Sequence, residues 1–145
     1  MLILDTDCLT IVQRAEGEPY QRLAARLDAV IATRSVHVTV ISLEEQMRGW
    51  LAYLAGQRTS RQQVDGYSRL LSLLQDFSSR SVLPFGDDAA RQMDHLRGQR
   101  VRIGTMDMKI AAIAMARGAT LISRNLRDFS RVPGLLVEDW TALRE

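Results

Sequence analysis

Acidic and amide side chains follow the apolar segments that the sequence predicts to be strands. They are Asp5 and Asp7 after the first such segment, Glu44 and Glu45 after the second, Asp107 in the first turn of a later helix, and Asn125 and Asp128 after the fourth. Because a parallel sheet carries its active site beyond the carboxyl ends of its strands, we expect these side chains to converge at one edge. Mg²⁺ and Mn²⁺ prefer such oxygen ligands, and they neutralise charge that develops on a phosphate. The pattern therefore predicts metal-dependent chemistry on a phosphate.

The sequence offers few ligands for zinc. It contains two histidines, His37 and His95, and one cysteine, Cys8, and their spacing matches no zinc site. We interpret His37 as a strand residue, His95 as a partly exposed helix residue and Cys8 as a small buried apolar residue. A single cysteine forms no internal disulfide, which suits a reducing compartment.

Each acid also has a purely structural interpretation. Asp5 would cap the turn that follows it, and Glu45 would complete a capping box with Ser42. Asp107 would interact with a helix dipole, and Asp128 would be an ordinary surface acid. The occurrence of all four acids at one predicted edge favours a functional site over four separate structural roles.

Strands and helices alternate along the chain and must position these acids. Strands are predicted at 2–4, 35–40, 82–85, 119–123 and 135–137, and helices at 8–14, 19–30, 42–56, 60–77, 87–96 and 105–118. Pro84 suggests an edge strand, Asp87 or Asp88 is expected to cap a helix, and residues 97–104 are predicted to form a loop. The alternation predicts one α/β domain over residues 1–145, with helices on both faces of a parallel sheet of four to five strands.

Composition sets limits on the class of protein. The 145 residues are 46% hydrophobic and 25% charged, as is typical of a globular domain, and the formal net charge of +2 is too small to indicate a nucleic-acid binder by itself. Lys109 is the only lysine among 19 basic residues, and arginine suits contact with phosphate. An acid follows the first apolar run at once, and no run approaches the ~20 residues of a membrane span. We therefore expect a cytoplasmic protein with no membrane partner.

Four segments, in order, resemble the VapC toxins of the PIN-domain ribonuclease family: LDTD, ISLEEQMRG, MDMKIAAIAMARGATLISRNLRDF and VPGLLVEDW. The resemblance runs through essentially the whole chain and implies a PIN-like three-layer α/β/α domain. It implies that Asp5, Glu45 and Asp107 are the catalytic acids and hold the metal. Glu45 is preferred over Glu44 because it opens a Glu-x-x-x-Gly unit that ends at Gly49.

The chain departs from the family pattern at one acid. Family members often carry a fourth acid at the position held here by Asn125, and Asp128 is the candidate to replace it as a catalytic residue. Asp7 is a supporting candidate, and Ser123 is a possible hydrogen-bond donor to the acids. Whether Asn125 or Asp128 completes the site stays open.

The resemblance implies an Mg²⁺- or Mn²⁺-dependent endoribonuclease that cleaves single-stranded RNA as the toxin of a type II toxin–antitoxin system. It also implies a homodimer and a VapB-type antitoxin, which would direct a basic residue into the acid pocket. The expected products carry a 5′ phosphate and a 3′ hydroxyl. Arginines near the rim, namely Arg97, Arg100, Arg102 or Arg124, would contact the RNA backbone.

Two alternatives belong to other classes. A PIN-fold binding module with impaired catalysis is compatible with Asn125, since a fold does not fix a function. A haloacid-dehalogenase-like phosphatase is suggested by residues 5–7, which read Asp-Thr-Asp, and by the acids of residues 86–88. That alternative is weaker, because Leu9 stands where Thr or Val is expected and Lys109 follows the late acids rather than preceding them.

Overall fold

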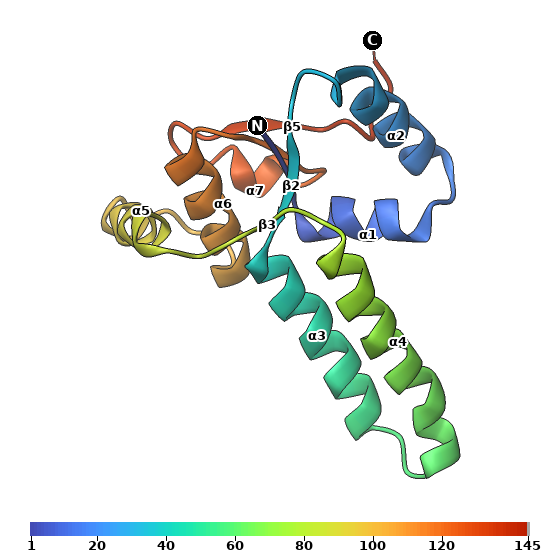
Figure 1. Ribbon diagram of the computed structural model, residues 1–145. Coiled ribbons are helices and arrows are strands. Elements are labelled where there is room, and N and C mark those ends of the chain that lie inside the picture. Colours follow the sequence, from blue (N-terminus) through green and yellow to red (C-terminus); the bar gives the residue numbers. More distant parts are fainter. Residues whose placement is uncertain (145) are drawn as a thin grey trace.

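A central sheet of five parallel strands organises the chain (Figure 1). The structure is a computed structural model that describes residues 1–144. The strands are β1 (Leu2–Leu4), β2 (Val36–Thr39), β3 (Val82–Leu83), β4 (Thr120–Ile122) and β5 (Leu136–Glu138), in the order β3-β2-β1-β4-β5. All four neighbouring pairs are parallel, and β3, which Pro84 follows, lies at an edge. The predicted fold class is confirmed.

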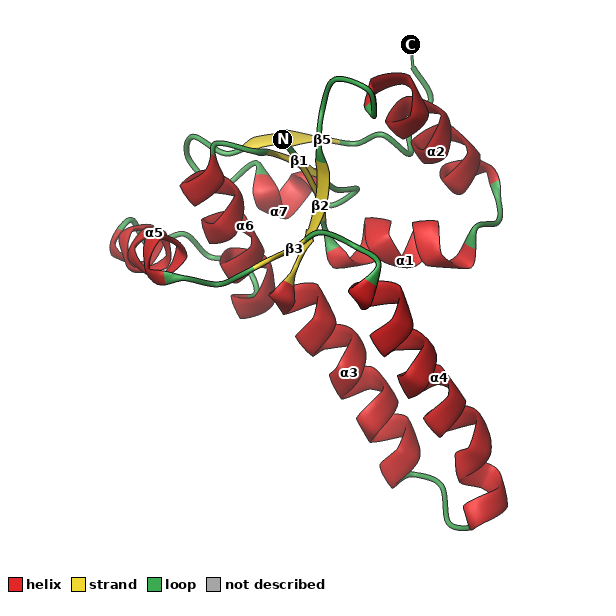
Figure 2. Ribbon diagram, in the orientation of Figure 1, coloured by secondary structure: helices red, strands yellow, loops and turns green. Residues whose placement is uncertain are grey.

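Helices surround the sheet and connect its strands (Figure 2). They are α1 (Thr6–Arg14), α2 (Glu18–Val30), α3 (Val40–Ala55), α4 (Ser60–Ser78), α5 (Asp87–Gly98), α6 (Thr105–Arg117) and α7 (Leu126–Phe129). Six of them match predicted helices, whereas the four-residue α7 was not expected. In the described part of the chain, no helix is long and apolar enough to cross a membrane.

The strands of the sheet send alternate side chains into two hydrophobic cores. Ile3 of β1 packs in the core under α5 and α6, whereas Leu2 and Leu4 pack in the core shared with α1, α2 and α4. All three side chains are at most 1% exposed. This burial explains why β1 is apolar at every position: a strand covered by helices on both faces has no polar side.

The strand order reverses direction at β1. β2 pairs with one side of β1 and β4 with the other, so the helices that follow them leave a crevice at the carboxyl ends of these strands. Asp5 enters this crevice directly after β1, and its backbone N–H donates to the carbonyl of Ile122 in β4 at 3.1 Å. The topology therefore opens a site where the sequence places its first acid.

Two predicted helix caps are wrong. β2 runs into α3 without a connecting residue, so Thr39 is the N-cap and its hydroxyl accepts the N–H of Ser42. Ser42 therefore lies inside the helix, and Glu45 is too far along it to complete a capping box. At α5, neither Asp87 nor Asp88 caps the helix, because both lie within its first turn after Gly86.

The boundaries of other segments also differ from expectation. Arg97 and Gly98 belong to α5, so the predicted loop begins only after them. The interpretations of His37, His95 and Cys8 are confirmed. His37 lies in β2 and contacts the Ser81 hydroxyl at 2.6 Å, His95 is exposed on α5, and Cys8 is fully buried.

Helices α3 and α4 form a hairpin that projects away from the sheet (Figure 1). Each carries an internal glycine, and the two glycines have opposite surroundings. A Cβ at Gly66 of α4 would lie 2.5 Å from a methyl carbon of Leu54 in α3, whereas a Cβ at Gly49 of α3 would meet nothing within 4 Å. The close approach of the two helices therefore depends on Gly66 and not on Gly49.

Replacing these glycines with alanine should change stability in opposite directions. Gly66→Ala should lower the free energy of unfolding by about 1 kcal/mol, because overpacking against Leu54 outweighs the better helix propensity of alanine. Gly49→Ala should raise it by about 0.5–1 kcal/mol, because only propensity changes. Urea denaturation of both variants measures the difference, and an equal gain in stability for both would contradict this packing.

Candidate active site

A pocket of about 530 Å³ lies at the carboxyl ends of the central strands. It is lined by Asp5, Thr6, Asp7, Thr10, Glu45, Asp107, Arg124 and Asn125. These residues come from the start of α1, from α3, from the first turn of α6 and from the segment after β4. The fold thus brings acids that are distant in sequence to one pocket, which is the arrangement that the metal chemistry proposed below requires.

Asp5 has a structural role and also lines the pocket. Its carboxylate is the N-cap of α1, accepting the N–H of Cys8 at 2.8 Å, and its other oxygen accepts the hydroxyl of Ser123 at 2.5 Å. The side chain is only 5% exposed. Burial raises the pKa of Asp5 above its ordinary value, although these hydrogen bonds oppose the shift. Each oxygen keeps a further lone pair with which it can bind a cation.

Thr6, which lies between Asp5 and Asp7, holds Glu45 in the pocket. The hydroxyl of Thr6 donates to Glu45 Oε1 at 2.7 Å and lies 2.8 Å from the hydroxyl of Ser42. Glu44 does not line the pocket; it accepts a hydrogen bond from Arg48 at 2.7 Å on the exposed side of α3. The structure therefore places Glu45, rather than its neighbour, beside the other acids.

Asp107 experiences the charge of the other acids. It lies half-buried in the first turn of α6, and its pKa is raised from 3.8 to about 6. Burial is the largest cause, followed by the negative charges of Glu45, Asp5 and Asp128. Carboxylates that repel one another in this way attract a cation, because a nearby positive charge would favour their ionised forms.

Asn125 and Asp128 occupy different places. Asn125 lines the pocket and caps α7, accepting the N–H of Asp128 at 3.4 Å and donating its amide to the Asp128 carboxylate at 3.0 Å. Asp128 is not among the lining residues and lies 3.8 Å from Arg131. Asn125 therefore lines the pocket, and Asp128, the predicted fourth acid, does not.

Arg124 forms one wall of the pocket. Its guanidinium donates to both carboxylate oxygens of Asp7, at 2.7 and 3.3 Å. Both side chains are about half-exposed, so the pair is accessible to a ligand. Of the arginines predicted at the rim, Arg124 lines the pocket, whereas Arg97, Arg100 and Arg102 do not.

The donors fit a hard divalent cation, but the acids do not form a complete ligand set by themselves. Within residues 1–144, no group of three or more His, Cys, Asp or Glu side chains is arranged as a metal-binding cluster. The shared pocket and the raised pKa of Asp107 are more informative here, because Mg²⁺ usually keeps several waters and uses only one or two protein carboxylates. The ligand set of Asp5, Glu45 and Asp107 therefore stays a prediction.

Sequence reasoning missed two polar residues of the pocket. Thr6 positions Glu45, and Thr10 lies one turn further along α1. The only sequence signal for Thr6 was its place between two acids. Because α1 begins at Thr6, its side chain faces the pocket. Thr10 carried no signal, because its position depends on how α1 packs against α3.

Comparison with known proteins identifies the family to which this fold belongs. The model of the PIN domain family matches residues 2–135. A tRNA(fMet)-specific endonuclease VapC of Salmonella typhimurium is 38% identical over 77 residues, which span 50% of this chain and 58% of that relative. The match therefore covers little more than half of the relative's length.

Two solved structures resemble the whole fold or much of it. DNA-bound VapBC from Salmonella typhimurium has a TM-score of 0.72 at 23% identity, over 96% of this chain and 97% of that one. VapBC-5 from Mycobacterium tuberculosis, a member of the VapBC family of toxin–antitoxin systems, has a TM-score of 0.51 at 30% identity, over 72% of this chain and 79% of that one. The chain therefore belongs to the PIN-domain family and is of its VapC type.

Proposed function

We propose that this protein is the toxin of a VapBC-type toxin–antitoxin system, a divalent-metal-dependent endoribonuclease that cleaves single-stranded RNA. The observation that carries the proposal is the pocket that Asp5, Glu45 and Asp107 all line, where burial and the charges of the neighbouring acids raise the pKa of Asp107. The relatives support the reaction class, because a similar protein is named an endonuclease specific for tRNA(fMet).

In the proposed mechanism, Asp5, Glu45 and Asp107 would hold Mg²⁺ or Mn²⁺. Such an ion, when bound, would activate a water molecule and offset the charge that develops on the phosphate. Thr6 and Ser123 fix the orientation of Glu45 and Asp5 through their hydroxyl groups. Glu45 and Asp5 are therefore oriented before a ligand binds.

Polar residues beside the acids would orient the RNA. Arg124 offers a guanidinium at the wall of the pocket and can exchange its contact with Asp7 for an RNA phosphate. Asn125 lines the pocket as a neutral donor and acceptor, and Asp128 acts on Asp107 only by its charge. Asn125 rather than Asp128 is therefore our candidate to contact water or substrate.

We propose a VapB-type antitoxin as the protein partner, in keeping with the solved relative of the VapBC family. A basic side chain of such a partner would be attracted to the same acids that attract a metal ion. Action on cellular RNA requires a cytoplasmic protein, as the sequence suggests. The homodimer and the single-domain organisation stay predictions.

The two alternatives differ in their support. A binding module without catalysis is favoured only by the amide at Asn125, which leaves the pocket with one acid fewer than the family pattern. The haloacid-dehalogenase-like phosphatase is set aside, because the chain belongs to the PIN-domain family. In addition, Asp87 and Asp88, the late acids of that alternative, lie at the start of α5 and do not line the pocket.

The proposal is tested with a matched pair of neighbouring acids. Purified protein should cleave single-stranded RNA in Mg²⁺ or Mn²⁺, and EDTA should stop the reaction. Glu45→Gln should reduce the rate about 10- to 100-fold, since it removes a charge at the metal while preserving the shape of the side chain. Glu44→Gln should leave the rate unchanged, because Glu44 bonds to Arg48 and does not line the pocket.

The products are mapped to identify the bond that breaks. Fragments with 5′ phosphates and 3′ hydroxyls would agree with hydrolysis by activated water. Cleavage that persists in EDTA, or equal losses in the Glu44→Gln and Glu45→Gln variants, would show that the pocket is not the catalytic centre. RNA binding without any cleavage would favour the binding module instead.

A further inference from the structure

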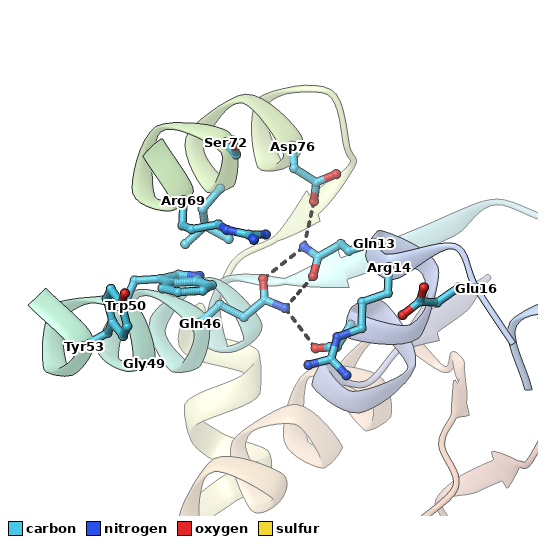
Figure 3. A pocket seen from close by; sticks show the side chains of 12 residues that line it. Gln13, Arg14, Glu16, Gln46, Gly49, Trp50, Tyr53, Arg69, Ser72 and Asp76 are labelled. Carbon is cyan, nitrogen blue, oxygen red and sulfur yellow. Dashed lines mark hydrogen bonds between the residues drawn. The ribbon is translucent and has the colours of Figure 1, made fainter. Parts of the chain in front are cut away.

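A second hollow lies beside the acid pocket and has no role in the mechanism above. It is a groove of about 820 Å³ between α1, α3 and α4 (Figure 3). Thr10 lines both the groove and the acid pocket, so the two hollows adjoin. A polymer that places one phosphate at the acids could therefore extend into the groove.

One stripe of α3 forms a wall of this groove. Gln46, Gly49, Trp50 and Tyr53 all line it, and their spacing of three and four residues puts them on one face of the helix. Glu45 precedes the stripe and faces the acids. The helical rise places Trp50 about 7.5 Å further along the axis than Glu45.

The groove contains an aromatic pair and a guanidinium. The rings of Trp50 and Tyr53 meet edge to face, with centroids 5.7 Å apart. The guanidinium of Arg69 from α4 lies over the Trp50 ring at 5.7 Å, as Figure 3 shows. Aromatic rings and arginines together bind unpaired bases of any sequence, because every base has a π-face.

The floor of the groove is polar and ordered. The side-chain amides of Gln13 and Gln46 bond to each other at 2.7 and 3.0 Å, and Gln13 also donates to Asp76 at 2.9 Å (Figure 3). Asp76 is neutralised by Arg80, which donates two hydrogen bonds of 2.9 Å to its carboxylate. The negative charge of Asp76 is therefore already compensated and would not repel a phosphate strongly.

The remaining charges of the groove are mixed and include two exposed cations. Arg14 and Arg69 both line it and are exposed, against one exposed acid, Glu16. Arg69 makes a surface pair with Asp65 at 3.5 Å, and both side chains are 60% exposed. Such a pair contributes little stability, so Arg69 can leave it to contact a phosphate.

We propose that this groove is a nucleotide subsite, in which Trp50 and Tyr53 stack on an unpaired base of the RNA close to the cleaved bond. The inference rests on the proposed function, because it assigns the groove to the same substrate. A protein segment would suit the apolar face of the hairpin better, where Leu71 and Leu74 are exposed. The polar floor and the arginines of the groove favour a nucleotide.

Binding is measured first, separately from cleavage. The probe is a short, labelled, single-stranded RNA of mixed sequence, and the protein carries Asp107→Asn so that the RNA stays intact. Tyr53→Ala and Arg69→Ala should each weaken binding about 5-fold or more. Arg91→Ala is the matched control for Arg69, because Arg91 also forms an exposed pair of 3.5 Å, with Asp88 on α5.

Tryptophan fluorescence gives a direct reading of the contact. The chain has two tryptophans, and Trp140 is only 3% exposed, with the guanidinium of Arg26 over its ring. RNA should therefore quench the emission of Trp50 alone. The quenching should vanish in Trp50→Phe, which keeps the half-buried ring packed and so keeps the fold.

Gly49→Leu fills the groove without disturbing the helix. A Cβ at Gly49 meets no atom within 4 Å, so the new side chain leaves the helix without a backbone clash. This variant should fold at least as stably as the wild type, yet its KM for RNA should rise about 10-fold with kcat little changed. A purely structural role of the groove would not separate stability from KM in this way.

The outcomes distinguish this inference from the proposed function. If wild-type protein cleaves no RNA, the proposed function fails. If it cleaves RNA but the groove variants match the wild type in binding, quenching and KM, the subsite is wrong and the nuclease stands. Loss of binding to a copurified protein partner, with RNA binding unchanged, would also overturn the subsite and assign the groove to that partner.

Discussion

Asp107→Asn is expected to reduce RNA cleavage about 100-fold or more while the protein stays folded. The substitution keeps the size of the side chain but removes a negative charge from the centre of the acid pocket. Loss of a ligand charge at a catalytic metal costs several kcal/mol in the transition state, and about 2.7 kcal/mol corresponds to 100-fold. The rate is measured on single-stranded RNA at saturating Mg²⁺, and circular dichroism verifies the fold.

Asp5→Asn should produce a similar loss for the same reason. Asparagine caps helices as well as aspartate does, so α1 should still begin at its present position. Asp88→Asn is the control, because Asp88 is an exposed acid near a helix start and pairs only with Arg91. A defect in Asp88→Asn with normal cleavage by Asp107→Asn would contradict the site.

The positions of the acids could be predicted because topology, rather than fine geometry, determines them. The apolar run before Asp5 and the β-branched run before Glu45 indicated parallel strands, whose ends share an edge. A helix was also predicted over residues 105–118, and the observed α6 buries Ile110, Ala111 and Ala112 completely. The alternation of strands and helices was sufficient to place these acids at one edge, and the family resemblance distinguished Glu45 from Glu44.

Capping was not predictable in the same way. Thr39 and Ser42 are both good cap residues, and the choice between them depends on how far β2 extends beside β3. Because the strand continues to Thr39, α3 begins at Val40 and Glu45 moves from a capping position into the pocket. The start of α3, a few residues earlier than predicted, therefore decides whether Glu45 caps the helix or lines the pocket.

The groove beside the acids was invisible to sequence reasoning. Its residues come from three helices, and Gln13, Trp50 and Arg69 are ordinary helix residues when taken separately. Only the crossing of α3 and α4, with Gly66 at their contact, places Arg69 over Trp50. Features that depend on the packing of helices against one another, rather than on strand ends, required the structure.

Metal-free protein should become less stable as the pH rises from about 4 to about 6. The pKa of Asp107 is 3.8 when unfolded and about 6 when folded, so the folded state binds the proton more tightly. The resulting stabilisation is fully present below pH 3.8 and is lost as the pH rises through 6. Burial raises the pKa of Asp5 as well, which acts in the same direction.

The size of this effect is limited by solvent. A shift from 3.8 to about 6 corresponds to about 3 kcal/mol at full strength. Asp107 is only half-buried, so screening should leave about 1 kcal/mol. Urea denaturation in EDTA at pH 4.5 and pH 7.5 measures the difference, and Asp107→Asn should show a smaller loss between these two pH values than the wild type or Asp88→Asn.

Divalent metal should reverse the loss and thereby connect stability with function. A cation that binds only the folded protein stabilises it, and it binds best once the acids are ionised. Mg²⁺ or Mn²⁺ should therefore raise Tm more at pH 7.5 than at pH 4.5 in the wild type, and much less in Asp107→Asn. An equal rise of Tm at both pH values, or in both proteins, would mean that the ion binds elsewhere. Metal binding would then not relieve the repulsion among these carboxylates.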